Sequence, residues 1–338
     1  MTHAVISPQN RSTLSTVPAI NSGSQKTTVH APPTCPLTGD SLCEILEDIP
    51  TSLLINCYQR DLGINVSSEF SGIEALQLCR GLESNLTFFH PAVVGSQAFY
   101  QKLESYDWYS PPNKFEYDRA ADWIRPGDHV LDVGCGVGHF AARIPHAHYS
   151  GLRPQQSPQL ETKEREITIY TEHLTDHAAS HIKYYDAVCA FQVLEHVADP
   201  VHFVELALRC LKPSGILVLG VPTAESYLTQ LTNFVLNAPP HHVTWWTDQA
   251  LRCLIQRCDL ELLSLDHAPV EPWELRLFWM QHLASAMTKP SKTHFTSSIK
   301  HSLLNIGTYL TAGILEIIRS APPDTQGASV VLIARKRK

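Results

Sequence analysis

Apolar and polar positions divide the chain into short apolar runs and segments with helical periodicity. The run Tyr185–Phe191 is almost entirely apolar, which is typical of a strand buried on both faces. In 115–124 and after Asp199-Pro200, apolar residues instead recur at near-helical spacing, and Asp-Pro signals a helix start. The second helix is expected to face a sheet with Val204, Ala207, Leu208 and Leu211. Strands are predicted at 128–133, 149–152, 166–170, 185–191, 216–221, 260–265 and 329–334.

The first of these strands leads into a glycine-rich turn. The apolar run ends at Asp132-Val133, glycines follow at Gly134, Gly136 and Gly138, and Phe140–Ile144 has the character of a helix. Glycine lets the backbone pass close to a ligand, and the free N–H groups of a helix N-terminus favour a polar or anionic group. The turn therefore predicts a nucleotide-type binding site, with G-x-G-x-G spacing rather than the dinucleotide pattern G-x-G-x-x-G.

This stretch resembles the first motif of the class I S-adenosylmethionine-dependent methyltransferases. Tyr185–Val197 resembles the family's fourth strand and following loop, and Leu211–Leu219 resembles its turn into the fifth. The resemblance runs from Phe115 to about Asp266. It implies an α/β, Rossmann-like sheet of seven mostly parallel strands, the last antiparallel, with helices on both faces. It also implies an enzyme with S-adenosyl-L-methionine as cofactor.

The resemblance places the cofactor at the carboxyl ends of the strands, which is the general rule for open α/β sheets. Asp132 is expected to order the glycine turn, and Gln192 to lie beside the methionine part. Glu172 either accepts from the adenine amine or is a solvated loop acid. The residues implied around the cofactor are Asp132, Gly134, Cys135, Gly136, Arg153, Thr171, Glu172, Ala190, Phe191 and Gln192.

Arg153 departs from the family pattern. Most relatives end the second strand with an acid that accepts hydrogen bonds from both ribose hydroxyls, and arginine cannot accept at all. One interpretation is that the ribose is held differently, through Gln155 or water, with weaker affinity. The other is an NADP-dependent oxidoreductase, because an arginine about 20 residues after a glycine turn can hold a 2′-phosphate. The glycine spacing and the later motifs favour the methyltransferase.

Three histidines are the catalytic candidates. His196 follows Glu195 and is either half of a structural pair or a base that takes a proton from the acceptor. His241 and His242 precede Thr247, which is expected to cap a helix, and they are interpreted as pocket-lining residues. Two adjacent histidines without a nearby third ligand argue against a metal, so none is expected.

The segments outside this region are harder to interpret. Residues 1–34 contain no acid and are interpreted as a flexible tail, with a transit peptide as the alternative. Residues 35–87 resemble a degenerate zinc ribbon, because Thr38 and Leu82 stand where relatives have the second cysteine of each pair. The aromatic segment 88–114 is either a linker or a lid, with Trp108 and Tyr109 as the residues to test.

The methyltransferase domain is expected to span 115–338, with a helical insertion at 270–322 and a shorter helical segment at 225–237. The larger insertion has Leu303, Gly307, Leu310, Ile314 and Ile317 on one stripe, which suggests a substrate cap or a homodimer surface. Its longest apolar stretch, 302–315, is too short to span a membrane.

Composition limits the partners and the compartment. The 338 residues carry a net charge of −7, which makes a general nucleic-acid surface improbable and favours a small-molecule or glycan-type acceptor. Nine scattered cysteines, an odd number, favour a reducing cytoplasm over a disulfide framework. We expect a methyltransferase that acts on oxygen of a small, glycan or lipid-linked acceptor. The non-enzymatic alternative is a degenerate methyltransferase fold that serves as a binding protein.

Overall fold

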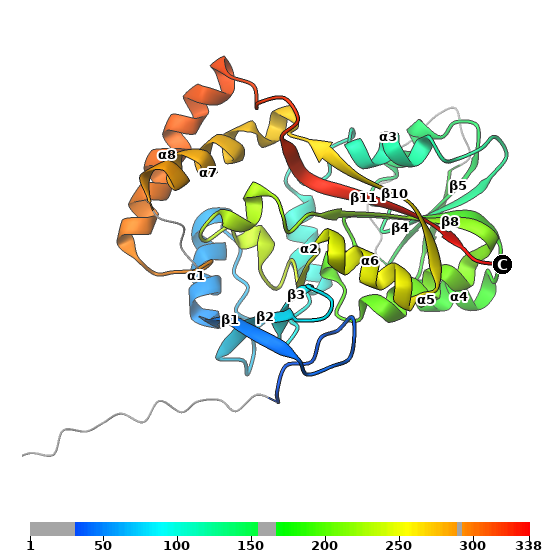
Figure 1. Ribbon diagram of the computed structural model, residues 1–338, viewed down its shortest axis with the longest axis horizontal. Coiled ribbons are helices and arrows are strands. Elements are labelled where there is room, and N and C mark those ends of the chain that lie inside the picture. The colour runs from blue at the N-terminus through cyan, green and yellow to red at the C-terminus, as the bar shows by residue number, and fades with distance from the viewer. Residues whose placement is uncertain (1–30, 155–166, 289–292) are drawn as a thin grey trace, which may run out of the picture.

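The computed structural model describes residues 31–154, 167–288 and 293–338. Their strands form one sheet of seven and one of four (Figure 1). Residues 1–30 and 155–166 lie outside the described part, and with them most of the expected tail and Gln155. The large sheet runs in the order β10 (Leu260–Pro269), β11 (Gln326–Lys336), β8 (Leu211–Pro222), β7 (Tyr185–Phe191), β4 (His129–Val133), β5 (His148–Arg153), β6 (Thr168–Thr171).

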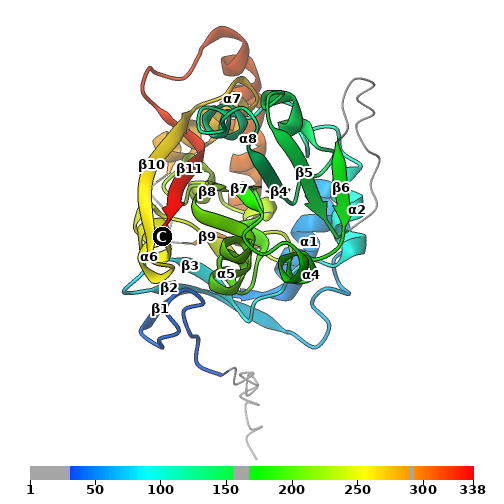
Figure 2. The same ribbon diagram turned by 90° about the vertical axis from the view of Figure 1, so that its right-hand side faces the viewer.

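The large sheet confirms the predicted fold class. β4 pairs in parallel with both β5 and β7, and β6 and β8 continue the parallel order on either side. β11 is antiparallel to both of its neighbours, β8 and β10. Figure 2 shows the strands side by side across the molecule. Every predicted strand is present, although β8 begins at Leu211, earlier than the predicted Ile216.

Helices cover both faces of this sheet (Figure 1). On one face α5 and α6 pack on Val188 and Leu219, and on the other α3 packs on Cys189 and Val218. These alternating contacts explain why β7 is almost entirely apolar. The helices around the sheet are α3 (Phe115–Ala121), α4 (Leu174–Ser180), α5 (Pro200–Cys210) and α6 (Asp248–Arg257).

Three helix predictions are corrected. Leu211 does not continue the face of α5, because its backbone is extended and pairs with Tyr185 in the sheet. The segment after the glycine turn is not an α-helix but the short 3₁₀ helix η1 (His139–Arg143), which ends where Ile144 leaves helical geometry. The predicted helical segment at 225–237 likewise holds only the 3₁₀ helices η3 (Tyr227–Gln230) and η4 (Val235–Asn237).

The smaller sheet joins the N-terminal segment to the rest of the chain. β1 (Cys43–Pro50), β2 (Ala75–Gly81) and β3 (Thr87–His90) form an antiparallel sheet, and α1 (Thr51–Leu62) lies between the first two strands. β3 then pairs with β9 (Thr244–Trp245), from the far part of the chain. The two parts share one apolar core, in which Tyr58, Phe89 and Phe99 meet Val235 and Trp245. The zinc-ribbon resemblance of this segment stays a prediction.

The predicted C-terminal insertion contains two long helices. α7 (Leu275–Met287) and α8 (Ile299–Ile318) pack against each other at the periphery (Figure 1). Since β10 runs parallel to the central strands, the insertion leaves the sheet at its carboxyl edge. The predicted apolar stripe of α8 faces outward: Leu303, Leu310, Ile314 and Ile317 are exposed, whereas the small residues Thr308 and Ala312 are buried. Among the described helices, none combines the length and the apolar character required to cross a bilayer.

Candidate functional site

The glycine turn leaves the carboxyl end of β4, in the middle of the sheet. The amide of Gly134 donates to the carbonyl of Leu152 at 2.8 Å, which fixes the turn to the end of β5. Gly136 has φ of 53°, and a Cβ placed there would meet no atom within 4 Å. This left-handed backbone conformation favours glycine, and the space beside the residue is open to a ligand.

Asp132 lies directly under the turn. Its carboxyl is buried and accepts a hydrogen bond from the Tyr149 hydroxyl at 2.8 Å, on the neighbouring strand β5. Burial raises the pKa of Asp132 to about 7, and the Tyr149 hydrogen bond opposes that rise. The side chain thus ties β4 to β5 below the turn. The sequence pattern of an acid before the glycines predicted Asp132 but not its hydrogen bond with Tyr149.

Arg153 reaches the same turn from the end of β5. Its side chain is buried, and Nη1 donates to the carbonyl of Gly136 at 2.8 Å. The arginine therefore satisfies a backbone acceptor of the turn itself. This contact is specific to a donor, so it explains how a residue that cannot accept a hydrogen bond fits at this position.

Glu172, just after β6, is partly exposed and paired with a buried histidine. Its carboxylate lies 2.7 Å from Nδ1 of His177 in α4, and Nε2 of that histidine lies 2.8 Å from the Tyr185 hydroxyl. The chain of contacts fastens the end of β6 to α4 and β7. Thr171, the last residue of β6, is exposed beside it.

The end of β7 places Gln192 at the same edge of the sheet. Gln192 has φ of 57°, and its amide donates to the carbonyl of Gly220 at 2.7 Å. Its side-chain amide donates to the carboxylate of Glu116 in α3 at 2.8 Å. Glu116 is buried and was missed by sequence reasoning, because a single acid on a helix carries no signal of its partner.

Ala190, Phe191 and Cys135 differ from the other predicted cofactor residues because their side chains are committed to the core. Phe191 stacks edge-on against Tyr117 and Phe140, with ring centroids 5.0 and 4.9 Å away. Ala190 packs on the opposite face of the sheet, and Cys135 is buried against Gly151. These three residues can offer a ligand mainly their backbone.

The three candidate histidines meet next to this edge. His196 lies in the 3₁₀ helix η2 (Leu194–His196), which follows Gln192 closely, and its Nδ1 lies 2.6 Å from the carbonyl of His241. The amide of Val243 donates to the carbonyl of Glu195 at 2.8 Å. Two hydrogen bonds therefore connect the segment that carries His196 with the segment that carries His241 and His242. Ligand nitrogens of the three histidines lie within 4.8 Å of one another. The expectation that His241 and His242 have no third ligand nearby is therefore wrong.

These groups form a buried cluster, the histidine cluster, defined as Glu195, His196, His241 and His242. Burial raises the pKa of Glu195 to about 8 and lowers the pKa of His196 to about 4. Burial also lowers the pKa values of His241 and His242 well below the usual range. At pH 7 the three imidazoles are therefore neutral and have lone pairs to offer.

Part of the aromatic segment 88–114 packs on the histidine cluster. The Tyr109 hydroxyl lies 3.0 Å from Nε2 of His241, and the Tyr100 ring, from α2 (Gln97–Glu104), packs edge-on against His196 at 5.6 Å. Trp108 stacks on Tyr106 instead and is 49% exposed. Of the two residues singled out from the sequence, only Tyr109 contacts a candidate histidine.

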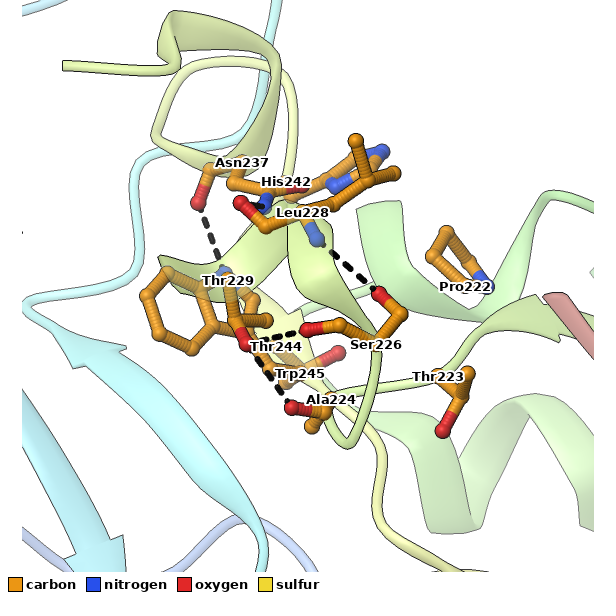
Figure 3. A pocket seen from close by; sticks show the side chains of 10 residues that line it. All are labelled: Pro222, Thr223, Ala224, Ser226, Leu228, Thr229, Asn237, His242, Thr244 and Trp245. Carbon is orange, nitrogen blue, oxygen red and sulfur yellow. Dashed lines mark hydrogen bonds between the residues drawn. The ribbon is translucent and has the colours of Figure 1, made fainter. Parts of the chain in front are cut away.

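Two cavities lie beyond the cluster. The one beside His242 measures only about 10 Å³, which is room for a single water molecule. Figure 3 shows the hydrogen bonds of Thr229 and Ser226 that close its walls. The second measures about 620 Å³ and lies between η3 and α7, where Gln230 and Gln281 line it. Neither cavity is lined by a residue of the glycine turn.

An open glycine turn at the carboxyl end of a central parallel strand defines a nucleotide-binding protein of the Rossmann-like α/β class. Residues 113–265 match the family model described as "Methyltransferase domain". This part of the chain, a little under half of the 338 residues, is a methyltransferase domain, and S-adenosyl-L-methionine is the cofactor that the family implies.

Individual relatives are similar over shorter stretches. Ubiquinone biosynthesis O-methyltransferases from Salmonella arizonae and Salmonella newport are each 35% identical over 97 residues, covering 26% of this chain. The chain spans 40% of the length of these curated relatives. A methyltransferase structure from Archaeoglobus fulgidus is 18% identical with a TM-score of 0.42, covering 64% of this chain and 90% of that one.

Proposed function

We propose that the protein transfers the methyl group of S-adenosylmethionine to an oxygen atom of a small-molecule, glycan or lipid-linked acceptor. The observation that carries the proposal is the open backbone at Gly136, held between β4 and β5 in a methyltransferase domain. The O-methyltransferase activity in the names of the matched relatives supports oxygen as the acceptor atom.

In this proposal the cofactor lies along the carboxyl edge of β4, β5, β6 and β7. Arg153 and Asp132 support the turn from below, because one satisfies the Gly136 carbonyl and the other ties β4 to Tyr149. Glu172 is held by His177, so only its second oxygen is available to the adenine amine. The proposed contacts of the cofactor are Asp132, Gly134, Cys135, Gly136, Arg153, Thr171, Glu172, Ala190, Phe191 and Gln192.

The acceptor is proposed to lie toward the histidine cluster, because η2 continues directly from Gln192. Methyl transfer from a sulfonium requires the acceptor oxygen in line with the S–CH₃ bond, about 3 to 3.5 Å away, in a site that excludes water. His196 is the candidate base: its Nδ1 proton is committed to the His241 carbonyl, so Nε2 has a lone pair for the acceptor proton. His241 and His242 would line the acceptor site.

Two further proposals concern the setting of the enzyme. All nine cysteines are free, which supports a reducing, cytoplasmic compartment. The outward apolar stripe of α8 supports either a cap over the acceptor or a homodimer surface.

Calorimetric titration with S-adenosylhomocysteine and, separately, NADPH tests the cofactor assignment. We expect heat with the first ligand and none with the second. Gly136→Val should weaken S-adenosylhomocysteine binding at least about tenfold, since a branched Cβ strains the left-handed backbone and enters the open space. Gly127→Val is the matched control: φ there is 83°, but the residue lies before β4, at the opposite edge of the sheet.

The outcomes separate the alternatives. Heat with NADPH alone would replace the methyltransferase by an NADP-dependent oxidoreductase. Equal loss of binding in Gly127→Val and Gly136→Val would show that the effect comes from general destabilisation and would refute the turn as the site. Binding of S-adenosylhomocysteine without methyl transfer to any acceptor in an extract, followed with a labelled methyl group, would favour the degenerate binding protein.

A further inference from the structure

Glu195 is a buried carboxyl that the described part of the chain leaves without a hydrogen-bond partner. The residue is 1% exposed, and neither carboxylate oxygen has a hydrogen-bond partner among the described residues. An unpaired carboxyl away from water is costly, and buried polar groups are almost always paired. The nearest basic atoms to Oε1 are Nε2 of His196 at 3.8 Å and Nε2 of His242 at 4.0 Å.

Two of the three histidines have their Nδ1 engaged by a backbone carbonyl, which leaves Nε2 as the free ring nitrogen for a ligand. Nδ1 of His196 is engaged with the carbonyl of His241, at 2.6 Å. Nδ1 of His241 is likewise engaged with the carbonyl of Leu236, at 2.9 Å. A histidine that donates one ring N–H to a backbone carbonyl presents its other nitrogen as a lone pair, and this is the usual arrangement around metal-ligating histidines.

The separations suit a small cation. Metal–ligand bonds of about 2.1 Å in a tetrahedral site place the ligand atoms roughly 3.4 Å apart. The carboxylate lies 3.8 and 4.0 Å from the two Nε2 atoms, and the three histidines offer nitrogens within 4.8 Å of one another. Closing the carboxylate onto the two Nε2 atoms requires each of these two pairs to approach by about half an ångström, and the histidine nitrogens approach one another by up to about 1.4 Å. The two loops that carry the ligands are already joined by the bond from Val243 to Glu195.

We propose that Glu195, His196 and His242 bind a divalent transition-metal ion, with His241 as the fourth ligand. Imidazole ligands favour zinc-type ions over magnesium or calcium, which prefer sets made of oxygen alone. The ion would supply the positive charge that Glu195 lacks. Tyr109 would then lose its contact with His241 Nε2 or share it. This inference stands on the cluster alone and does not depend on methyl transfer.

A metal ligand cannot also be the base. His196 has one lone pair to offer, so in the metal-bound protein it is a ligand and not the base, and methyl transfer there rests on positioning of the acceptor alone. The competing explanation of the same cluster is a proton on Glu195 beside neutral imidazoles. The two explanations differ in whether the purified protein binds a metal stoichiometrically.

The test uses the full chain without a polyhistidine tag. The protein is stripped with a chelator, dialysed and titrated with Co²⁺, whose visible absorption reports tetrahedral nitrogen and oxygen ligands. Zn²⁺ is then added in competition, and metal content is measured by mass spectrometry. We expect one equivalent of Co²⁺, displaced by Zn²⁺. Glu195→Gln, which keeps the side-chain shape, should weaken binding at least about tenfold, and His242→Ala should act likewise.

His267→Asn is the control, because the cluster of Glu225, Asp248 and His267 is the more exposed alternative and its histidine is already paired with Asp248 at 3.0 Å. Binding should survive in this variant. Absence of Co²⁺ and Zn²⁺ binding by the wild type would overturn the inference, as would undiminished binding in a folded Glu195→Gln variant. Titration with S-adenosylhomocysteine on the same samples shows separately whether the cofactor site is intact.

Discussion

At the scale of single residues, the protein buries carboxyl groups in two different ways. Glu274 is buried but satisfied: Oε2 accepts from the Tyr227 hydroxyl at 3.0 Å and from the amide of Ala328 at 3.1 Å. Burial nevertheless raises the pKa of Glu274 to about 8. Glu195 has the same raised pKa without such partners. The first carboxyl fastens the start of α7 to β11, and the second is available to a ligand.

Glu274→Gln should make stability less dependent on pH. The pKa of about 8 in the folded protein lies above the ordinary value of 4.5 for glutamate, so Glu274 contributes stability that is fully present below pH 4.5 and is lost as pH rises through about 8. Glutamine keeps an acceptor and cannot ionise. Urea unfolding at pH 5 and pH 8 should therefore show a smaller fall in unfolding free energy in the variant than in the wild type.

Glu261→Gln is the control for that measurement, because Glu261 is exposed on β10 beside Arg335. Its pH dependence should match that of the wild type, since the contributions of Asp132 and Glu195 are common to all three proteins. If Glu274→Gln and the wild type lost the same free energy between the two pH values, the raised pKa would be refuted.

At the scale of elements, α8 shows what periodicity can and cannot predict. The apolar stripe predicted at Leu303, Leu310 and Ile314 exists, but it points away from the molecule. The contact with α7 is made on the other side, where Thr308 and Ala312 allow the helices to approach. Small residues have little weight in a hydrophobic pattern, so the sequence predicted the helix and its stripe but not which side is buried.

Substitutions on the two sides of α8 should differ sharply. Ala312→Leu inserts volume into the packed side and should cost about 1 to 3 kcal/mol of unfolding free energy. Leu310→Gln lies on the outward stripe and should change it by less than about 0.5 kcal/mol. Urea denaturation of both variants measures the difference. A large cost for Leu310→Gln would contradict an uncovered stripe, and light scattering would then show whether a second copy covers it.

At the scale of the whole molecule, the N-terminal segment is part of the site. The expected boundaries at 87 and 115 are crossed by the pairing of β3 with β9 and by a shared core. The Tyr58 hydroxyl in α1 contacts the carbonyls of Val235 and Ala238, each at 2.8 Å, just ahead of His241. The loop that carries two of the candidate histidines is thus held by residues nearly 180 positions away.

Tyr58→Phe should loosen that loop. It removes the hydroxyl donor from two buried carbonyls, which keep their backbone donors, so it should cost about 0.5 to 1.5 kcal/mol of unfolding free energy. Amide exchange at Val243 should also accelerate relative to amides in β4. Tyr184→Phe, at a position that is 46% exposed, is the control and should change neither quantity. Unchanged exchange at Val243 in the Tyr58 variant would show that α1 does not hold the loop.

The strands, the glycine turn and the start of α5 could be predicted because each has a local signal: an apolar run, an acid before glycines, a proline at a helix start. The residues that these side chains contact in the folded protein could not be predicted. Nothing near Arg153 in the sequence indicates the carbonyl of Gly136, and nothing near His242 indicates His196. β9 has only two residues, too few for any pattern. These contacts depend on long-range pairing, which a single sequence does not display.

The pairing of β3 with β9 also fixes an order of events during synthesis. Domains generally fold from the N-terminus as the chain emerges. Thr87 and Phe88, however, pair with Trp245 and Thr244, which are synthesised much later. More than 150 residues must therefore leave the ribosome before the edge of the first hairpin is protected. In that interval the nascent protein presents an unpaired strand to its surroundings, and chaperones that bind such edges would be needed most before residue 245 appears.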